Sequence, residues 1–150
     1  MKPTVDLFWS FRSPYSYLAT PGALEIPVKF AVSLRFRPVL PLAVRQPDFF
    51  SPENFKRAKY ILVDWPRRAE MLGLPHAWPS PDPIIQDLET FKVAEPGSHR
   101  EEVSENQHAL EQSGQWGVPT FVFNGEPFFG QDRSETLCWR LRKENLAIFN

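Results

Sequence analysis

Residues 8–19 constrain the fold more than any other stretch, because they join a strand-like segment directly to a helix start. Residues 4–10 alternate as a strand does when it is partly buried on both faces. Ser13 can cap a helix, and Pro14 can occupy its first position, where a missing N–H costs nothing. Such a turn directs backbone N–H groups and the positive end of the helix dipole at one spot. From this spacing alone, Ser13 is either an ordinary helix cap or part of a binding site.

A βαβ unit is expected at the start of the chain. A helix should run from Pro14 to about Ser33 and kink or break at its internal Pro21, Gly22 and Pro27. Residues 34–37 alternate again and form a second strand that stops at Pro38. Two strands joined by a helix pair in parallel, with a right-handed crossover.

The middle of the chain is expected to be loop and helix. Residues 38–52 hold four prolines, which indicates a loop. A helix should follow, interrupted at Pro66 and ended by Gly73, because apolar residues recur there at spacings of three and four. That stripe consists of Phe55, Ala58, Leu62, Trp65, Ala69 and Leu72. Residues 75–83 should form an extended loop, and residues 84–93 a short helix.

Two further signals follow in the last third of the sequence. Ser98 and Glu101 form a capping box for a helix that reaches Gln112. Asn124 and Gly125 separate two β-rich runs, which is the pattern of a type I′ hairpin. The hairpin is the clearest local signal in the chain.

The last helix should run from a cap at Asp132, paired with Glu135, to about Lys143. The element order is then βαβ, helices and ββα, over one domain that spans residues 1–150. Periodicity by itself supports an α/β fold in which helices cover a sheet.

Composition excludes several classes of protein. The net charge of −1 provides no excess for binding nucleic acid or an anionic membrane. No apolar run approaches the roughly 20 residues of a membrane-spanning helix. Prolines number 16, but 14% of the residues are aromatic, so the sequence indicates a compact fold with many turns rather than disorder.

The only cysteine is Cys138, so an intramolecular disulfide is impossible and a reducing, cytoplasmic location is expected. The three histidines lie in different segments without a partner at i+3 or i+4, and we therefore expect no metal site. Cys138 sits within the last predicted helix beside Leu137 and Trp139, where a small buried thiol is the expected role.

Ser13 and Ser16 occupy the positions at which thioredoxin-like redox enzymes carry Cys-x-x-Cys, after the first strand and at the helix start. With serine in both positions, the protein cannot carry out thiol–disulfide exchange there. The same hydroxyl, N–H groups and helix dipole can still stabilise a sulfur anion that a ligand supplies.

Three segments in this order resemble the 2-hydroxychromene-2-carboxylate isomerase family, which is close to kappa-class glutathione transferases and DsbA-like proteins. They are residues 11–19, 117–121 and 129–133, and residues 59–75 are similar to the first insert helix of that family. The resemblance covers most of residues 4–143. It implies a thioredoxin-like βαβ…ββα fold with a helical insertion.

The resemblance implies that glutathione is the cofactor. Ser13 would donate a hydrogen bond to the glutathione thiolate. Val118 would precede a cis-proline, Pro119, and pair through its backbone with the cysteinyl residue of the tripeptide. Gln131 and Asp132 would hold the γ-glutamyl end, with the Asp132 carboxylate facing its ammonium group; Asp132 could do so while also capping the last helix.

Further positions are implied more weakly. Arg57 falls near the place where kappa-class relatives present a lysine to glutathione. A pocket for a small aromatic, carboxylate-bearing substrate could be lined by Arg12, Arg45, Tyr60, Trp65 and Trp78, although Trp65 also belongs to the apolar stripe of its helix.

The chain departs from the family in length, because family members carry a longer helical insertion between the two halves of the domain. Residues 51–97 would be its remnant, joined to the second half around residues 93–98. The missing helices normally cover the second-substrate pocket and contribute to the dimer. We still expect a homodimer, and we expect apolar surface around Phe49, Phe50 and Trp65 to need a cover.

The sequence thus predicts a glutathione-dependent isomerase that acts on an unsaturated aromatic substrate. Two alternatives stay open: a kappa-like glutathione transferase that acts on electrophiles, and a non-catalytic module for glutathione binding or dimerisation.

Overall fold

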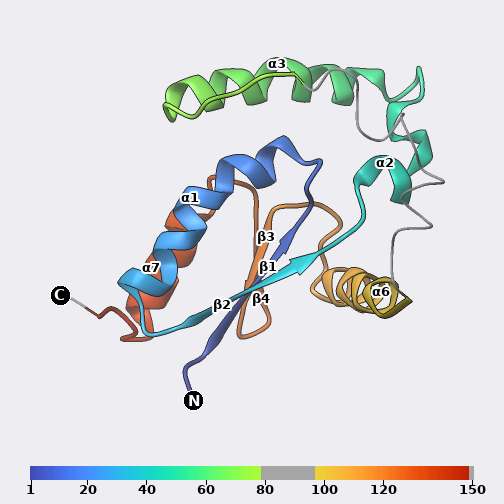
Figure 1. Cartoon of the computed structure of the whole chain (residues 1–150). Coiled ribbons are helices and arrows are strands. Elements are labelled where there is room, and N and C mark those ends of the chain that lie inside the picture. The colour runs from blue at the N-terminus through green and yellow to red at the C-terminus, as the bar shows by residue number, and fades with distance from the viewer. Residues whose placement is uncertain (79–96, 149–150) are drawn as a thin grey trace.

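A four-stranded mixed sheet forms the centre of the computed structural model, which describes residues 1–78 and 97–148 (Figure 1). Its strands are β1 (Thr4–Trp9), β2 (Ser33–Pro38), β3 (Thr120–Phe123) and β4 (Glu126–Phe129), in the order β2-β1-β3-β4. β1 pairs in parallel with β2, and the other two pairings are antiparallel. The predicted βαβ unit and the later hairpin therefore form one sheet.

Helix α1 (Pro14–Lys29) connects β1 to β2 without a break, contrary to the interruption expected at Pro21, Gly22 and Pro27. Its buried side chains Leu18, Ala19, Ala23 and Ile26 anchor it against the core, which offsets the backbone hydrogen bonds that the prolines lack. The helix also ends earlier than the expected Ser33, because Phe30 is extended and Ser33 already pairs in the sheet.

The two faces of the sheet are covered by different helices. α1 and α7 (Ser134–Lys143) lie side by side on one face and enclose the main core (Figure 1). α6 (Gly97–Gln112) packs through Leu110 against Phe8 on the other face. Burial on both sides explains why the adjacent residues Leu7 and Phe8, which point to opposite faces of the sheet, are both apolar.

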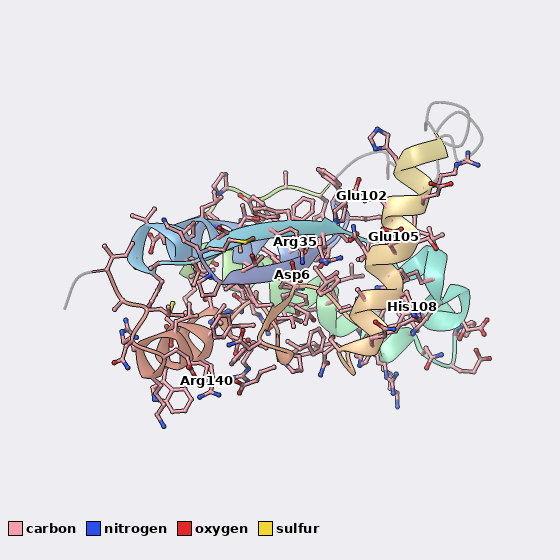
Figure 2. The ribbon with its side chains drawn as sticks, turned by 90° about the horizontal axis from the view of Figure 1, so that it is seen from below. Asp6, Arg35, Glu102, Glu105, His108 and Arg140 are labelled. Atoms are coloured by element: carbon pink, nitrogen blue, oxygen red, sulfur yellow. The ribbon has the colours of Figure 1, made fainter. Side chains whose placement is uncertain are left out.

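Charged side chains on neighbouring elements of the sheet are paired. Asp6 on β1 accepts hydrogen bonds from Arg35 on β2, with Nη2 at 2.8 Å, and Arg37 Nε lies 3.2 Å from its other oxygen (Figure 2). On the opposite side, Arg140 of α7 donates to Glu126 of β4 at 2.7 Å. Burial alone would raise the pKa of Asp6, but the hydrogen bonds from Arg35 and the nearby charge of Arg37 outweigh it and lower that pKa.

Helix α6 has a narrow buried face. Figure 2 shows Glu102, Glu105 and His108 along this helix, and all three are exposed. Asn106 is buried instead, where it donates to the Pro38 carbonyl at 3.1 Å and accepts from Arg37 at 3.0 Å. The helix begins at Gly97, one residue before the expected cap at Ser98. The side chain of Ser98 is not among those that the structure describes.

The prediction of a loop over residues 38–52 is wrong in part. The segment holds a short helix α2 (Leu42–Arg45) and a 3₁₀ helix η1 (Pro47–Phe50). Pro41 occupies the position before the first helix without a side-chain capping bond, and Pro47 begins the second, since proline is tolerated in the first turn of a helix. Phe49 is only 8% exposed, so it needs no further cover.

Helix α3 (Phe55–Met71) crosses the N-terminal end of α1 (Figure 1). It continues through Pro66, where an interruption was expected, because Ala58, Trp65 and Ala69 on either side of this residue are buried. It ends where predicted, at Gly73 with a φ of +67°. The helix expected at residues 84–93 lies outside the described residues.

The hairpin is confirmed, because Asn124 and Gly125 have φ angles of 50° and 80°, as a type I′ turn requires. The assignment of residues 51–97 to a reduced insertion stays a prediction. Among the described helices, none has the length and apolar character needed to cross a membrane.

Candidate functional site

Ser13 is the N-cap of α1, as its sequence context predicted. Its Oγ accepts a hydrogen bond from the Ser16 N–H at 3.2 Å, and Pro14 occupies the first helical position. The Ser16 hydroxyl is buried and accepts from the Ser10 N–H at 3.3 Å. Both serines in the positions of a redox Cys-x-x-Cys thus have hydrogen-bonding roles in the turn.

The Ser13 hydroxyl also faces the loop before β3. Its Oγ lies 3.4 Å from the Val118 carbonyl oxygen, to which it donates a long hydrogen bond. The Val118–Pro119 peptide bond is cis, as expected. Within the described residues, no hydrogen bond uses the Val118 N–H, and the side chain is only partly buried. This N–H is therefore a donor that a ligand can use.

A cavity of about 470 Å³ opens beside this loop. Four expected site residues, Val118, Pro119, Gln131 and Asp132, line it, whereas Ser13 adjoins it through Val118 and is not part of its wall. The other lining residues come from α1, α3 and the end of β4 and are Tyr15, Asp64, Arg68, Phe129 and Gly130. The size is within the range of small-molecule sites.

Asp132 does not cap the last helix, which corrects the sequence prediction. Residues before α7 make one more turn, so that Arg133 holds the cap position without a side-chain cap bond. The Asp132 carboxylate is instead half-exposed at the cavity, 3.5 Å from Arg133 Nη2. Gly130 has a φ of +123°, and a Cβ there would lie 2.8 Å from Asp132 Oδ1. Glycine thus makes room for the carboxylate.

Gln131 is held by α3. With its amide oriented so that the oxygen faces the guanidinium group, Gln131 Oε1 accepts from Arg68 Nε and Nη2, both at 3.0 Å. The Arg68 Nη1 atom lies 3.3 Å from the Met71 sulfur. The long helix and the loop before α7 are joined through this pair.

Tyr15 and Asp64 form a second link between α1 and α3. The Tyr15 hydroxyl donates to Asp64 Oδ2 at 2.7 Å, and the Tyr60 hydroxyl donates to Oδ1 at 3.2 Å. Burial raises the pKa of Tyr15, and the hydrogen bond to Asp64 raises it further. Tyr15 is consequently a neutral hydrogen-bond donor in the cavity wall over the physiological pH range.

Tyr15, Asp64 and Arg68 were missed from the sequence as site residues. The available signal was the i, i+4 spacing of Asp64 and Arg68, which places both on one side of α3 next to the buried Trp65 and Ala69.

The remaining expected residues lie outside the cavity wall. Arg57 is exposed on the first turn of α3, and Arg12 is half-buried. Tyr60 is 63% exposed and reaches the site only through Asp64. Arg45 donates to the carbonyls of Leu40 at 2.8 Å and Trp116 at 2.9 Å, and burial lowers its pKa.

The two tryptophans proposed for a substrate pocket pack against each other instead. Trp65 is 6% exposed, in a cluster with Leu18 and Ala69, and therefore needs no further cover. Trp78 is exposed and meets the Trp65 ring edge-on, with centroids 5.1 Å apart.

A second cavity of about 480 Å³ adjoins the first between α1, α3 and α7. The two share Arg68, Gln131 and Asp132 in their walls. The two cavities therefore adjoin at these three side chains, and together they are called the groove.

Cys138 and the potential metal ligands lie apart from the two cavities or from one another. Cys138 packs against the main core, and burial raises the pKa of its thiol. Across residues 1–78 and 97–148, no group of three or more potential ligands is placed to hold a metal ion.

Comparison with known proteins gives fold relatives only. No protein-family model and no curated protein matches the sequence. A solved structure of a selenomethionine-labelled 2-hydroxychromene-2-carboxylate isomerase matches with a TM-score of 0.67 and 20% identity, over 95% of this chain and 97% of that one. A structure described as a probable DsbA oxidoreductase from Streptomyces coelicolor matches with a TM-score of 0.61 and 14% identity, over 94% and 89% of the two chains.

These neighbours confirm the DsbA-like, thioredoxin-like α/β fold that the sequence motifs indicated. One neighbour is an isomerase and the other is described as an oxidoreductase, so the fold by itself is compatible with more than one reaction.

Proposed function

We propose that this protein is a glutathione-dependent isomerase of the 2-hydroxychromene-2-carboxylate isomerase type. The observation that carries the proposal is the meeting of Ser13, at the N-terminus of α1, with Val118 at a distance of 3.4 Å. At this contact a helix end that can stabilise a thiolate lies close to the Val118 N–H, which has no hydrogen-bond partner among the described residues. Both are next to a cavity of about 470 Å³.

The residues present fit a tripeptide thiol. The Val118 N–H can donate to the cysteinyl carbonyl, in the manner of an added strand. Gln131 and Asp132 line the groove beyond it, and the Asp132 carboxylate suits an ammonium group. The expected γ-glutamyl contacts are thus adjacent to the expected cysteinyl contact.

Bound glutathione would supply a thiolate that adds reversibly to an activated double bond of the substrate, which rotates as a single bond before the thiolate leaves. Ser13 has the geometry to stabilise that charge. Its only donated hydrogen bond in the described structure is the 3.4 Å contact with Val118, so the hydroxyl hydrogen can turn to a stronger acceptor. The N-terminal dipole of α1 acts in the same direction.

Dithiol redox chemistry is excluded for this chain by its own residues. Ser13 and Ser16 stand in the two cysteine positions, and the single thiol of Cys138 is partly buried on α7, where it packs against the main core. A disulfide exchange cycle needs a second thiol that the chain does not have.

One observation favours a glutathione transferase as the second candidate. Arg12, Arg45 and Tyr60, the residues expected to bind an aromatic acid, do not line the cavity. A glutathione site whose wall lacks these three expected residues is suited to conjugating diverse electrophiles. Glutathione binding without turnover would leave a non-catalytic module, whose predicted homodimer can be checked by light scattering.

Two assays on the full chain separate these functions. Isomerisation of a benzylidenepyruvate should require glutathione and exceed conjugation of a generic aromatic electrophile. Ser13→Ala should lower the isomerisation rate, whereas Ser104→Ala, on the exposed face of α6, should not. Conjugation without isomerisation would favour the transferase, and an unchanged rate in Ser13→Ala would reject the proposed role of this residue.

A further inference from the structure

The Arg68 guanidinium lies where the two cavities meet and lines both. Its hydrogen bonds go to the neutral Gln131 amide and to the Met71 sulfur. Among the residues that the structure describes, no carboxylate lies within 4.0 Å of it. The groove therefore contains a positive charge that no described acid neutralises.

Nearby acids have other partners. Asp64 accepts from the hydroxyls of Tyr15 and Tyr60. Asp132 lies 3.5 Å from Arg133, but both side chains are half-exposed, so the pair is weak. Glu135, in the second cavity, follows at the start of α7. Arg68 thus has no acidic partner within 4.0 Å among the described residues, and Asp132 is an accessible anion in the walls of the same two cavities.

Gln131 fixes the relation between these two charges. Arg68 is hydrogen-bonded to the Gln131 side chain, and Asp132 is the next residue along the loop. The groove thus presents a cation and an anion on either side of one residue. An α-amino acid head group carries the complementary pair, a carboxylate and an ammonium group on one carbon.

We propose that Arg68 is a specificity-determining residue that binds the α-carboxylate of a γ-glutamyl group whose ammonium faces Asp132. This inference rests on the proposed function, because the γ-glutamyl end of glutathione carries such a head group. Three of the five guanidinium N–H groups are used by Gln131 and Met71, which leaves two for the carboxylate.

The test uses calorimetry on the full chain with two thiol-free peptides. One is γ-glutamyl-2-aminobutyryl-glycine, and the other is its 4-aminobutanoyl analogue, which lacks only the α-carboxylate. Arg68→Met should weaken binding of the first peptide by about 10- to 100-fold. The unaltered protein should bind the analogue equally weakly, and Arg68→Met should weaken that binding no further.

Two variants control for folding and for general charge. Arg67→Met removes the neighbouring arginine, which is exposed on α3, and should leave both affinities unchanged. Arg68→Lys keeps the charge but not the planar fork, and should recover part of the lost affinity.

Each possible result of these measurements leads to a different conclusion about Arg68. Equal weakening of both peptides by Arg68→Met would mean that Arg68 only orders Gln131, and would overturn the assignment. An unchanged peptide affinity with a raised KM for the aromatic acid would also overturn it, since the carboxylate would then be the substrate's. Failure of the unaltered protein to bind either peptide would reject it outright. Selective, Arg68-dependent peptide binding without isomerase activity would uphold this inference while rejecting the proposed function.

Discussion

Ser13 Oγ and the Val118 carbonyl oxygen lie 3.4 Å apart although 105 residues separate them in the chain. The contact joins the N-terminus of α1 to the loop that enters β3. Each side brings one feature that a thiol ligand can use: a helix end with a hydroxyl group, and a backbone N–H without a partner among the described residues. Ser13 is thus a structural cap, and under the proposed function it is also the residue that stabilises the ligand thiolate.

Replacing Ser13 should therefore have two separable effects. Ser13→Ala removes the cap on the Ser16 N–H and should lower the free energy of unfolding by about 1 kcal/mol. It also removes the donor to the thiolate, so kcat/KM should fall by about 10- to 100-fold. Denaturant unfolding and steady-state kinetics measure the two effects.

Ser13→Thr is the matched control, because it keeps the hydroxyl group. It should retain most of both the stability and the activity. A loss of activity in Ser13→Thr as large as in Ser13→Ala would show that steric fit at this turn, rather than the hydroxyl, determines the rate.

The Tyr15–Asp64 hydrogen bond should stabilise the packing of α1 against α3. Tyr15→Phe should cost about 1 kcal/mol of unfolding free energy, since the bond of 2.7 Å to a carboxylate is partly buried. Tyr60→Phe, which removes an exposed hydroxyl with a 3.2 Å bond to the same carboxylate, should cost less than about 0.5 kcal/mol.

The contribution of Tyr15 to the free energy of unfolding should decrease at high pH. The folded protein raises the pKa of Tyr15 above its ordinary value of 10.0, so it holds a proton that the unfolded chain releases. The stabilisation by Tyr15 is complete below about pH 10 and is lost as the pH rises further. Equal losses in Tyr15→Phe at pH 8 and pH 11 would contradict this linkage.

Much of the sheet could be predicted from local sequence. Asn124-Gly125 specifies its hairpin through backbone angles alone, and the alternation in β1 indicates a strand wherever that strand is placed. The internal prolines led to the prediction of interrupted helices, and that prediction failed because tertiary packing is not visible in any local sequence pattern. Pro21 and Pro66 weaken their helices, but burial of Ala23, Trp65 and nearby side chains outweighs the cost.

The site was predictable to the extent that it rests on loops with distinctive residues. Val118, Pro119, Gln131 and Asp132 line one cavity, and the bond before Pro119 is cis as expected, whereas the glutathione contacts that the resemblance implied for them stay predictions. The part supplied by α3 was not predicted, because the approach of Arg68 to Gln131 depends on how that helix crosses α1. The turn that moves the cap from Asp132 to Arg133 also has no clear sequence signal.

Asp6 should make the fold sensitive to acid. Its pKa is lowered by Arg35 and Arg37 against the opposing effect of burial, so its stabilisation is present above about pH 4 and is lost as the pH falls below that value. Asp6→Asn should cost about 1 kcal/mol at pH 7 and progressively less in acid, as measured by urea unfolding. Asp48→Asn, at an exposed position in η1, is the control, and a pH-independent loss in Asp6→Asn would argue against the ion pairs as its cause.

Cys138 should be dispensable for activity. Burial raises the pKa of its thiol, and it packs against the core on the face where α7 lies. Cys138→Ala should keep glutathione-dependent turnover within about twofold, with a stability loss of about 1 kcal/mol from the missing sulfur. Selective loss of turnover in a folded Cys138→Ala protein would mean that the chain itself contributes the reactive thiol.

The central claim is that the Ser13–Val118 junction holds a ligand thiolate, and the pKa of bound glutathione tests it most directly. Glutathione is titrated into the full chain by calorimetry, and the thiolate absorbance of the complex is then followed against pH. The account predicts binding, with the pKa of the bound thiol about one unit or more below that of free glutathione in the unaltered protein and closer to the free value in Ser13→Ala. Absence of binding, or a bound thiol whose pKa equals that of free glutathione in both proteins, would contradict it.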